Sequence, residues 1–264
     1  MHRRLAATAL ALTAALTLSA CASGAADPAP EGEDFGLVKA GTLTVATEGT
    51  YRPFTFHDES GDLVGFDVEI AEAVADKLGL EIVFQETQWD AIFAGLDAGR
   101  FDVIANQVSI NPEREAKYLF SEPYTVSPGV IVVKEDDDSI SSFADLAGKT
   151  TAQSLTSNWY TLAEENGAEV QAVEGWAEAV TLLRQDRVDA TVNDNLTFLD
   201  YETTNGPTGL KIAAETDDPA YNAFAFTKDK EALVAAIDEA LSELRDEGVL
   251  AEISEKYFGA DVTQ

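Results

Sequence analysis

FDVIANQVSINPEREAKYLFSEPYT, residues 101–125, joins a predicted buried strand to a polar turn and a short helix. Its apolar residues 103–105 predict the strand. Pro112 suits the first turn of a helix, where its missing N–H costs nothing, and Asn111 before it is a favourable N-cap. Arg114 falls within that turn, where a guanidinium beside exposed N–H groups can hold a small carboxylate with two parallel hydrogen bonds. The alternative is a surface arginine on a polar helix.

Strand and helix patterns alternate along the chain on both sides of this stretch. Short apolar runs and period-two alternation predict strands, and apolar residues at helical spacing predict helices. The predicted strands are residues 43–46, 80–84, 130–133, 150–153, 170–173, 188–192, 210–214 and 223–226. The longer predicted helices are residues 65–79, 89–98, 158–167, 176–185, 230–247 and 250–257. Such alternation is typical of βαβ units, so we predict an α/β fold with parallel sheets covered on both faces.

The first residues are typical of an export signal. Arg3 and Arg4 precede an apolar run rich in Ala and Leu, residues 5–18, which is too short for a good membrane span. We therefore predict a signal peptide over residues 1–20 and an extracytoplasmic protein.

Cys21 follows Leu18-Ser19-Ala20, and this tetrapeptide resembles a bacterial lipoprotein box. The resemblance implies that the Cys21 thiol carries a diacylglyceryl group, becomes the mature N-terminus and anchors the protein to the cell membrane. The alternative is an ordinary small residue near a cleavage site. No other cysteine is present, so no disulfide can form within the chain. The small, acidic, Pro-containing composition that follows predicts a flexible tether over residues 21–36.

The charge of the chain excludes one class of partner. The sequence has 48 Asp and Glu against 17 Lys and Arg, a net charge of −31. It offers no basic patch to neutralise phosphates, so we expect no nucleic-acid partner. It also shows no cluster of metal ligands, and we expect no metal or other cofactor.

Residues 101–125 resemble the first-lobe signature of the family 3 solute receptors of bacterial ABC importers. Similar segments span nearly the whole chain after the tether: EGTYRPF, GFDVEIAEAVADKLG, TQWDAIFAGL, GKTTAQSLTSN, VDATVNDN and KYFGADV. The resemblance implies a two-lobed periplasmic-binding-protein fold of type II, in which two hinge strands join two Rossmann-like lobes. It places lobe 1 at residues 37–126 and 221–264, and an inserted lobe 2 at residues 127–220.

The resemblance also assigns the charged contacts of a bound amino acid. Arg114 matches the arginine that holds the α-carboxylate, and Ser109 adds a hydroxyl to the same group. Asp194 matches the carboxylate that pairs with the α-ammonium group, although an aspartate there can equally be a helix N-cap. Because Arg114 and Asp194 belong to different lobes, a zwitterion would favour the closed state.

The remaining predicted ligand contacts are aromatic or polar. Tyr51 and Trp89 match two aromatic walls, although each could instead belong to the core. At residues 153 and 157 the family often has Lys and Gly, so this chain departs from the pattern there. The predicted polar contacts are Glu48, Gln107, Gln153, Thr156 and Ser157.

We therefore predict a monomeric receptor that captures an amino acid, delivers it to an ABC permease in the membrane and catalyses no reaction. The phrases EGTY, ANQVSI, AQSLTSN and FGADV resemble cystine-binding members of the family most. Another polar or basic ligand, such as arginine, histidine or glutamine, is the alternative, because Glu48 could face a cationic side chain. A dehydratase on the same fold is a second class, and Glu48 would be its only candidate acid or base. A sensor is a third class, but we expect no signalling domain after Gln264.

Overall fold

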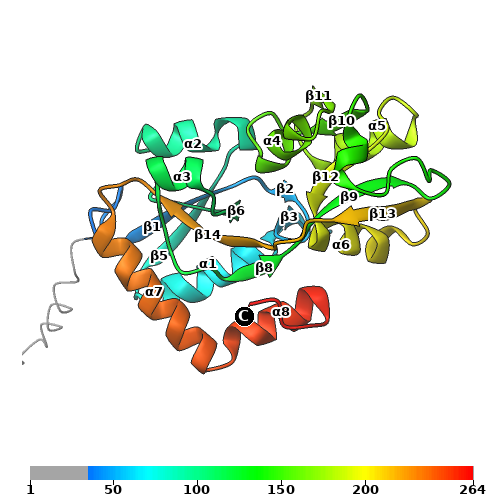
Figure 1. Cartoon of the computed structure of the whole chain (residues 1–264). Helices are drawn as coiled ribbons and strands as arrows, with labels where there is room; N and C mark the ends of the chain where they lie inside the picture. The colour runs from blue at the N-terminus through cyan, green and yellow to red at the C-terminus, as the bar shows by residue number, and fades with distance from the viewer. Residues whose placement is uncertain (1–34, 264) are drawn as a thin grey trace, which may run out of the picture. The chain divides into compact units, whose positions relative to one another are not determined.

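A computed structural model of the chain describes residues 35–263 (Figure 1). The predicted signal peptide, the lipidation of Cys21 and residues 21–34 of the predicted tether lie outside this part. Phe35, the first described residue, packs against the core of the large sheet. Within residues 35–263, no helix combines the length and the apolar character that crossing a bilayer requires.

Lobe 1 is built on six strands: β1 (Thr42–Thr47), β5 (Glu81–Glu86), β6 (Val103–Ser109), β7 (Leu119–Phe120), β8 (Thr125–Ser127) and β14 (Ala220–Phe226). Their order is β5-β1-β6-β14-β7, and β8 also pairs with β14. Strands β1 and β6 are buried along their whole length, as expected where helices cover both faces of a sheet.

Five helices surround this sheet: α1 (Phe66–Lys77), α2 (Trp89–Asp97), α3 (Pro112–Lys117), α7 (Glu231–Asp246) and α8 (Val249–Phe258). Figure 1 shows α1, α7 and α8 on one face and α2 and α3 on the other. The first face buries alternate sheet residues such as Leu43 and Val45 against Ile70 and Ile237. On the second face, Ile104 packs with Ile92 of α2. The period of two along the strands thus creates two separate apolar layers.

A small three-stranded sheet follows β1: β2 (Thr50–Tyr51), β3 (Thr55–His57) and β4 (Leu63–Val64). The turn between β3 and β4 is held by the Asp58 carboxylate, which accepts the main-chain N–H groups of Ser60 and Asp62. This sheet places Tyr51 at the edge of lobe 1 that faces lobe 2.

Lobe 2 contains five strands: β9 (Gly129–Lys134), β10 (Thr150–Gln153), β11 (Glu169–Ala172), β12 (Thr191–Asp194) and β13 (Leu210–Glu215). Its helices are η1 (Phe143–Leu146), α4 (Asn158–Glu165), α5 (Trp176–Arg184) and α6 (Asn195–Asn205). The three strands in the order β12-β9-β13 form one sheet, and β10 pairs with β11 beside it. A single bridge between Thr151 and Ala190 continues the pairing toward β12.

The prediction of parallel sheets is only partly right. Strands β5, β1 and β6 are parallel, as are β10 and β11. In contrast, β14 is antiparallel to β6, and β12 and β13 are antiparallel to β9. The reason is topological, because a chain that returns through the junction of two lobes runs against the strands it left.

Two neighbouring strands connect the lobes. Strand β8 carries the chain out of lobe 1, and β14 brings it back, with Tyr221 opposite Val126 and Asn222 opposite Thr125. The two predicted hinge strands are therefore confirmed, and so is the two-lobed α/β fold. The exact residue limits predicted for each lobe stay a prediction.

Candidate ligand-binding site

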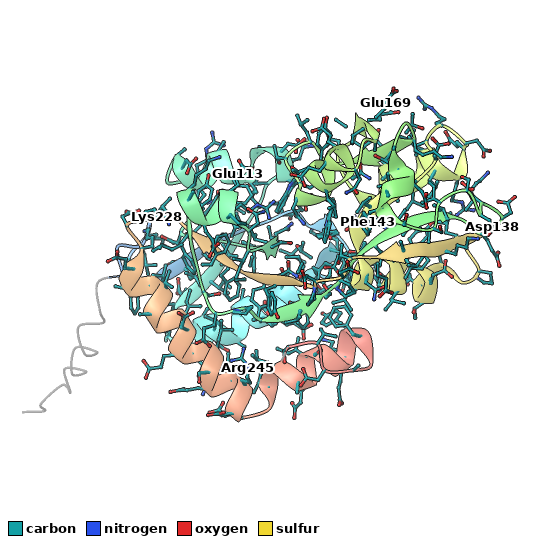
Figure 2. All side chains as sticks on the ribbon, in the orientation of Figure 1. Glu113, Asp138, Phe143, Glu169, Lys228 and Arg245 are labelled. Atoms are coloured by element: carbon teal, nitrogen blue, oxygen red, sulfur yellow. The ribbon has the colours of Figure 1, made fainter. Side chains whose placement is uncertain are left out.

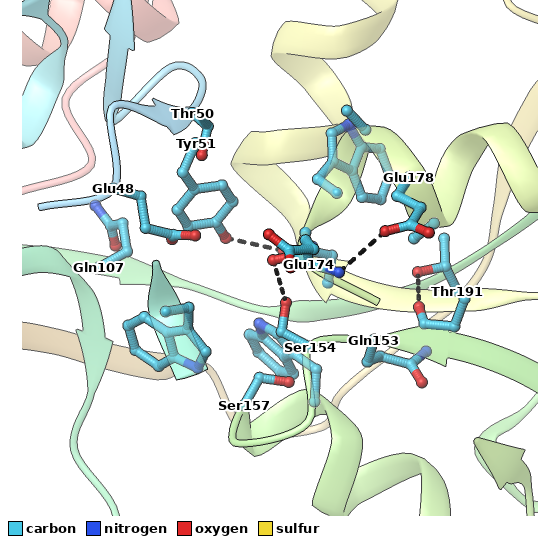
Figure 3. A pocket seen from close by; sticks show the side chains of 18 of the residues that line it. Glu48, Thr50, Tyr51, Gln107, Gln153, Ser154, Ser157, Glu174, Glu178 and Thr191 are labelled. Atoms are coloured by element: carbon cyan, nitrogen blue, oxygen red, sulfur yellow. Dashed lines mark hydrogen bonds between the residues drawn. The ribbon is translucent and has the colours of Figure 1, made fainter. Parts of the chain in front are cut away.

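Two cavities lie between the lobes. The larger has a volume of about 310 Å³, within the usual range for small-molecule sites, and both lobes line it (Figure 3). The predicted site residues among its lining are Glu48, Tyr51, Trp89, Gln107, Gln153 and Ser157.

The smaller cavity has a volume of about 220 Å³. The predicted site residues that line it are Arg114, Thr156 and Ser157. Because Ser157 and Asn158 line both cavities, the two spaces adjoin. Ser109 and Asp194 line neither, so the structure does not bring Arg114 and Asp194 to one cavity wall.

Arg114 is positioned by the turn that the sequence predicts. The Asn111 carboxamide oxygen accepts the Arg114 main-chain N–H at 2.9 Å, which caps α3. The guanidinium donates to the Ser109 carbonyl oxygen at 2.9 Å and lies 5.2 and 5.3 Å from the ring centroids of Trp89 and Phe93. Burial lowers its pKa to about 10, and it pairs with no carboxylate within residues 35–263. A buried cation without a counter-ion is a suitable site for a carboxylate.

Glu48 stands directly after β1, at the carboxyl end of the strand. Its main-chain N–H donates to the Asn106 carboxamide oxygen at 2.8 Å, and Asn106 Nδ2 donates back to Glu48 Oε2 at 2.7 Å. Burial raises the pKa of Glu48 to about 7, against the opposing effect of this hydrogen bond. The carboxylate is thus held rigidly at the cavity and gains stability from any nearby cation.

Gln107 occupies the left-handed backbone region, with φ 48°, which is uncommon outside glycine. The Asp67 carboxylate stabilises this conformation by accepting the Gln107 main-chain N–H at 2.6 Å and its Nε2 at 3.0 Å. Tyr124 also donates to Asp67, at 2.8 Å. Asp67 is fully buried, and burial raises its pKa to about 7. One buried carboxylate therefore fixes the backbone that leads toward Arg114.

Tyr51 and Trp89 form aromatic parts of the larger cavity. The Tyr51 hydroxyl donates to Asn193 Oδ1 at 2.9 Å and accepts from Thr197 Oγ1 at 3.1 Å. Both partners belong to lobe 2. Trp89 is the first residue of α2 and is 7% exposed, and its buried indole N–H has no hydrogen-bond partner within residues 35–263. Burial raises the pKa of Tyr51 well above its usual value, so its phenol is neutral.

The predicted residues of the lobe 2 loop have different environments. Gln153 is buried at the end of β10. Its Oε1 accepts from Thr151, and its Nε2 has no partner in the part of the chain that the structure describes. Ser157 caps α4 by accepting the Tyr160 N–H at 3.1 Å. Thr156 is exposed and turned toward lobe 1, where its main-chain N–H and its hydroxyl both donate to a carboxylate oxygen of α2.

Asp194 and Ser109 are buried beside the cavities. Asp194 Oδ1 caps α6 by accepting the Leu196 N–H at 2.8 Å, and its Oδ2 accepts from Ser127 at 2.5 Å. Burial raises the pKa of Asp194 to about 6. The Ser109 hydroxyl donates to Asn222 Oδ1 at 2.8 Å. In this structure the N-cap function of Asp194 is thus present, and the hydroxyl of Ser109 already has a protein partner.

Direct hydrogen bonds and an ion pair join the two lobes. Besides the contacts of Tyr51, Asp90 accepts from Thr156 at 3.0 and 2.9 Å, and Arg52 pairs with Asp200 at 3.1 Å. A further hydrogen bond runs from Gln88 to Glu174 across the larger cavity. The lobes are therefore in contact on both sides of the ligand-sized space.

Several lining residues were not predicted from the sequence. They include Asn106, Trp159, Glu174, Trp176 and Glu178. Trp176 is the first residue of α5, just as Trp89 is the first residue of α2. The same positional signal, an aromatic residue where a loop enters a helix, could have identified it.

The comparisons with known proteins agree with this geometry. Residues 43–260 match the family described as bacterial extracellular solute-binding proteins, family 3. The chain belongs to this family. The predicted family membership is confirmed, and the chain is an extracytoplasmic solute-binding protein rather than an enzyme.

Among curated relatives, the L-cystine-binding protein TcyA of Bacillus subtilis is 48% identical over 253 residues, which are 94% of each chain. Two solved structures are also similar. An ancestral arginine-binding protein bound to glutamine is 38% identical, with a TM-score of 0.79, and the match covers 84% of this chain and 99% of the other. The L-cystine solute receptor of Neisseria gonorrhoeae, unliganded and open, is 47% identical, with a TM-score of 0.59, over 85% and 95% of the two chains.

The two TM-scores rank opposite to the sequence identities. The open receptor is closer in sequence but more distant in structure than the ligand-bound protein. The lobes of this chain touch across the cavities, whereas the Neisseria gonorrhoeae receptor was solved in its unliganded open conformation. The arrangement described here is therefore a closed one.

Proposed function

We propose that this protein is the receptor of an ABC importer and captures L-cystine between its lobes. The observation that carries the proposal is Arg114. This residue is 8% exposed, lines a cavity shared by both lobes and has no carboxylate partner among the described residues. Leaving a buried cation unpaired is costly, and a ligand carboxylate would remove that cost with charge-assisted hydrogen bonds.

The other contacts of the ligand follow from the two linings. Tyr51 and Trp89 flank it, and Glu48 offers a carboxylate to an ammonium group. Asp194 remains our proposed partner of the α-ammonium group, because each of its oxygens keeps a lone pair beyond the one used in the protein. The further polar contacts we propose are Gln107, Ser109, Gln153, Thr156 and Ser157.

Two observations lead us to propose cystine rather than another amino acid as the ligand. The relative from Bacillus subtilis and the receptor from Neisseria gonorrhoeae, whose names specify L-cystine, share almost half of their residues with this chain. Cystine also carries two ammonium groups, and the larger cavity has carboxylates in its lining but no basic side chain. That second observation equally favours a basic amino acid such as arginine, which is the alternative ligand.

Lobe closure is the proposed mechanism of capture. Arg114 and the aromatic walls belong to lobe 1, whereas Gln153, Ser157 and Asp194 belong to lobe 2. A ligand that contacts both sets has a higher affinity for the closed state, and this difference shifts the population toward closure. The closed form would then be recognised by the membrane permease.

Anchoring completes the proposal. We propose that lipid on Cys21 holds a monomeric receptor near its permease. Labelled palmitate should enter the wild-type protein and not the Cys21→Ala variant. Equal labelling of both would contradict the lipoprotein assignment while leaving the ligand assignment intact.

A thermal-shift screen tests the ligand. Purified protein is heated with each amino acid in turn, without reductant, because cystine would otherwise be reduced to cysteine. A ligand at about one hundred times its Kd stabilises the fold by about 2.7 kcal/mol, a visible shift in Tm. Cystine should give the largest shift. A shift in Tm with arginine and none with cystine would mean that arginine, not cystine, is the ligand. No shift with any amino acid would contradict the receptor function.

A further inference from the structure

The larger cavity has a charge pattern that binding one amino-acid head does not require. Apart from the phenol of Tyr51, its ionisable lining side chains are the carboxylates Glu48, Glu174 and Glu178, and no Lys, Arg or His is among the lining residues. All three tryptophans of the chain line the same cavity: Trp89, Trp159 and Trp176. Aromatic faces together with carboxylates favour a cation, and an ammonium group benefits from both.

The polar atoms buried in this lining also point to a ligand. The Nε1 of Trp89, the Oε1 of Gln107 and the Nε2 of Gln153 have no partner in the part of the chain that the structure describes. Each of these side chains is less than 9% exposed. Buried polar groups in folded proteins are normally hydrogen-bonded, so donors and an acceptor left unpaired around one cavity indicate a polar occupant.

Glu174 is held over this cavity by its neighbours at the start of α5. Its main-chain N–H donates to Glu178 Oε2 at 3.1 Å, and its carbonyl oxygen accepts from Ser154 Oγ at 3.2 Å. Its carboxylate accepts a hydrogen bond from Gln88 of lobe 1. In Figure 3, Glu174 lies between Tyr51 and Ser154, toward the centre of the cavity. The Glu174 carboxylate is therefore a lobe 2 group that reaches the lobe 1 wall only when the lobes are closed.

We propose that Glu174, with the aromatic faces of Trp159 and Trp176, forms a subsite on the lobe 2 wall for a second ammonium group of the ligand. This subsite selects α-amino acids that carry a distal ammonium group over those that lack one. It rests on the proposed amino-acid receptor function and deepens it. Since Glu174 meets lobe 1 through Gln88, selection for the second ammonium group is coupled to closure.

The test compares two disulfides that differ by one ammonium group. The mixed disulfide of L-cysteine and 3-mercaptopropionate keeps both carboxylates and the sulfur bridge of cystine but lacks one ammonium. Calorimetry measures both ligands with the wild-type protein and with Glu174→Gln, which removes the charge and keeps the shape and an acceptor for Gln88. Glu164→Gln, an exposed change on α4 away from both cavities, is the matched control.

The wild-type protein should bind cystine about tenfold more tightly than the mixed disulfide, the size expected for an ion pair combined with a cation–π contact. Glu174→Gln should reduce this ratio to about twofold or less by weakening cystine alone. Glu164→Gln should keep it. An unchanged ratio in Glu174→Gln, or equal binding of both disulfides by the wild type, would overturn the subsite and leave the receptor function standing. Binding of neither disulfide would overturn both.

Discussion

The two walls of the cleft are built in different ways. On the lobe 1 wall, Arg114 and Gln107 are more than nine-tenths buried, and hydrogen bonds from the core fix Gln107, Glu48 and the turn before Arg114. On the lobe 2 wall, Thr156 and Glu174 are exposed and are held mainly by loop contacts and by lobe 1 itself.

Because of this difference, the two walls should contribute differently to ligand binding. A preorganised wall loses little entropy when the ligand binds, so lobe 1 should supply most of the affinity. On the lobe 2 wall, Thr156 and Glu174 gain their lobe 1 partners only on closure, so they should contribute selectivity and a bias toward the closed state. Changes in lobe 1 should therefore cost more binding than changes in the contacts between the lobes.

Replacement of Arg114 should have the largest effect. Arg114→Ala leaves the ligand carboxylate desolvated and unpaired, and we expect a loss of about 3 to 5 kcal/mol in binding free energy. Folding should change much less, because the guanidinium forms no ion pair within residues 35–263, and removing a buried charge offsets the loss of its hydrogen bond to the Ser109 carbonyl oxygen. Calorimetry with cystine measures the loss, and Arg100→Ala, at an exposed arginine that lines neither cavity, serves as the control. Affinity within about twofold of wild type for Arg114→Ala would contradict the preorganised wall.

Asp67→Asn should affect stability rather than contact with the ligand. Asn can no longer accept all the hydrogen bonds from Gln107 and Tyr124, and we expect a loss of about 1 to 3 kcal/mol in the free energy of unfolding. Asp76→Asn, on the exposed side of the same helix, is the control. Urea unfolding of both variants measures the difference.

The same carboxylate predicts a pH dependence. Burial raises the pKa of Asp67 from its ordinary 3.8 to about 7. Between these two pH values, the folded state therefore binds more protons than the unfolded state. The stabilisation from this group is complete below about pH 4 and is lost as the pH rises toward about 7. Glu48 and Asp194 act in the same direction. Asp67→Asn should therefore partly flatten the dependence of the free energy of unfolding on pH. An unaltered dependence would show that Asp67 titrates normally.

Tyr51→Phe tests the contacts between the lobes at the hinge side of the cavity. The ring remains, but the hydrogen bonds to Asn193 and Thr197 are lost, and we expect about 1 kcal/mol weaker cystine binding. Small-angle scattering of the ligand-free variant should show a more open average than the wild type. An identical profile and identical affinity would mean that these hydrogen bonds do not bias closure.

Arg52→Gln should have the smallest effect. The Arg52 side chain is 47% exposed and that of its partner Asp200 is 12% exposed, and a pair open to solvent on the arginine side contributes about 1 kcal/mol. We expect less than about threefold weaker binding, and less still at high salt. A tenfold loss of affinity would show that contacts between the lobes contribute more to binding than the difference between the two walls predicts.

Local patterns predicted those parts of the fold that depend on neighbouring residues. The cap of Asn111 on α3 and the aromatic entry of Trp89 into α2 follow from short-range sequence rules, and the structure contains both. The direction of β14 could not be predicted in this way, because it depends on where the chain returns after lobe 2.

The candidate site was predictable in lobe 1 more than in lobe 2. Glu48 and Arg114 sit at strand ends and helix starts, where sequence alone suggests a cleft. The position of Glu174 depends on Gln88, which is 86 residues away in the chain. No periodicity or local motif encodes such a contact, because it forms only when the two lobes close.

A crystal structure of the protein with L-cystine, grown without reductant, tests the central claim most directly. We expect one molecule between the lobes, with an α-carboxylate bound to the Arg114 guanidinium by two hydrogen bonds of about 2.8 Å. An ammonium group should lie against the carboxylates of the larger cavity. A ligand bound elsewhere, or with Arg114 facing no carboxylate, would contradict the account.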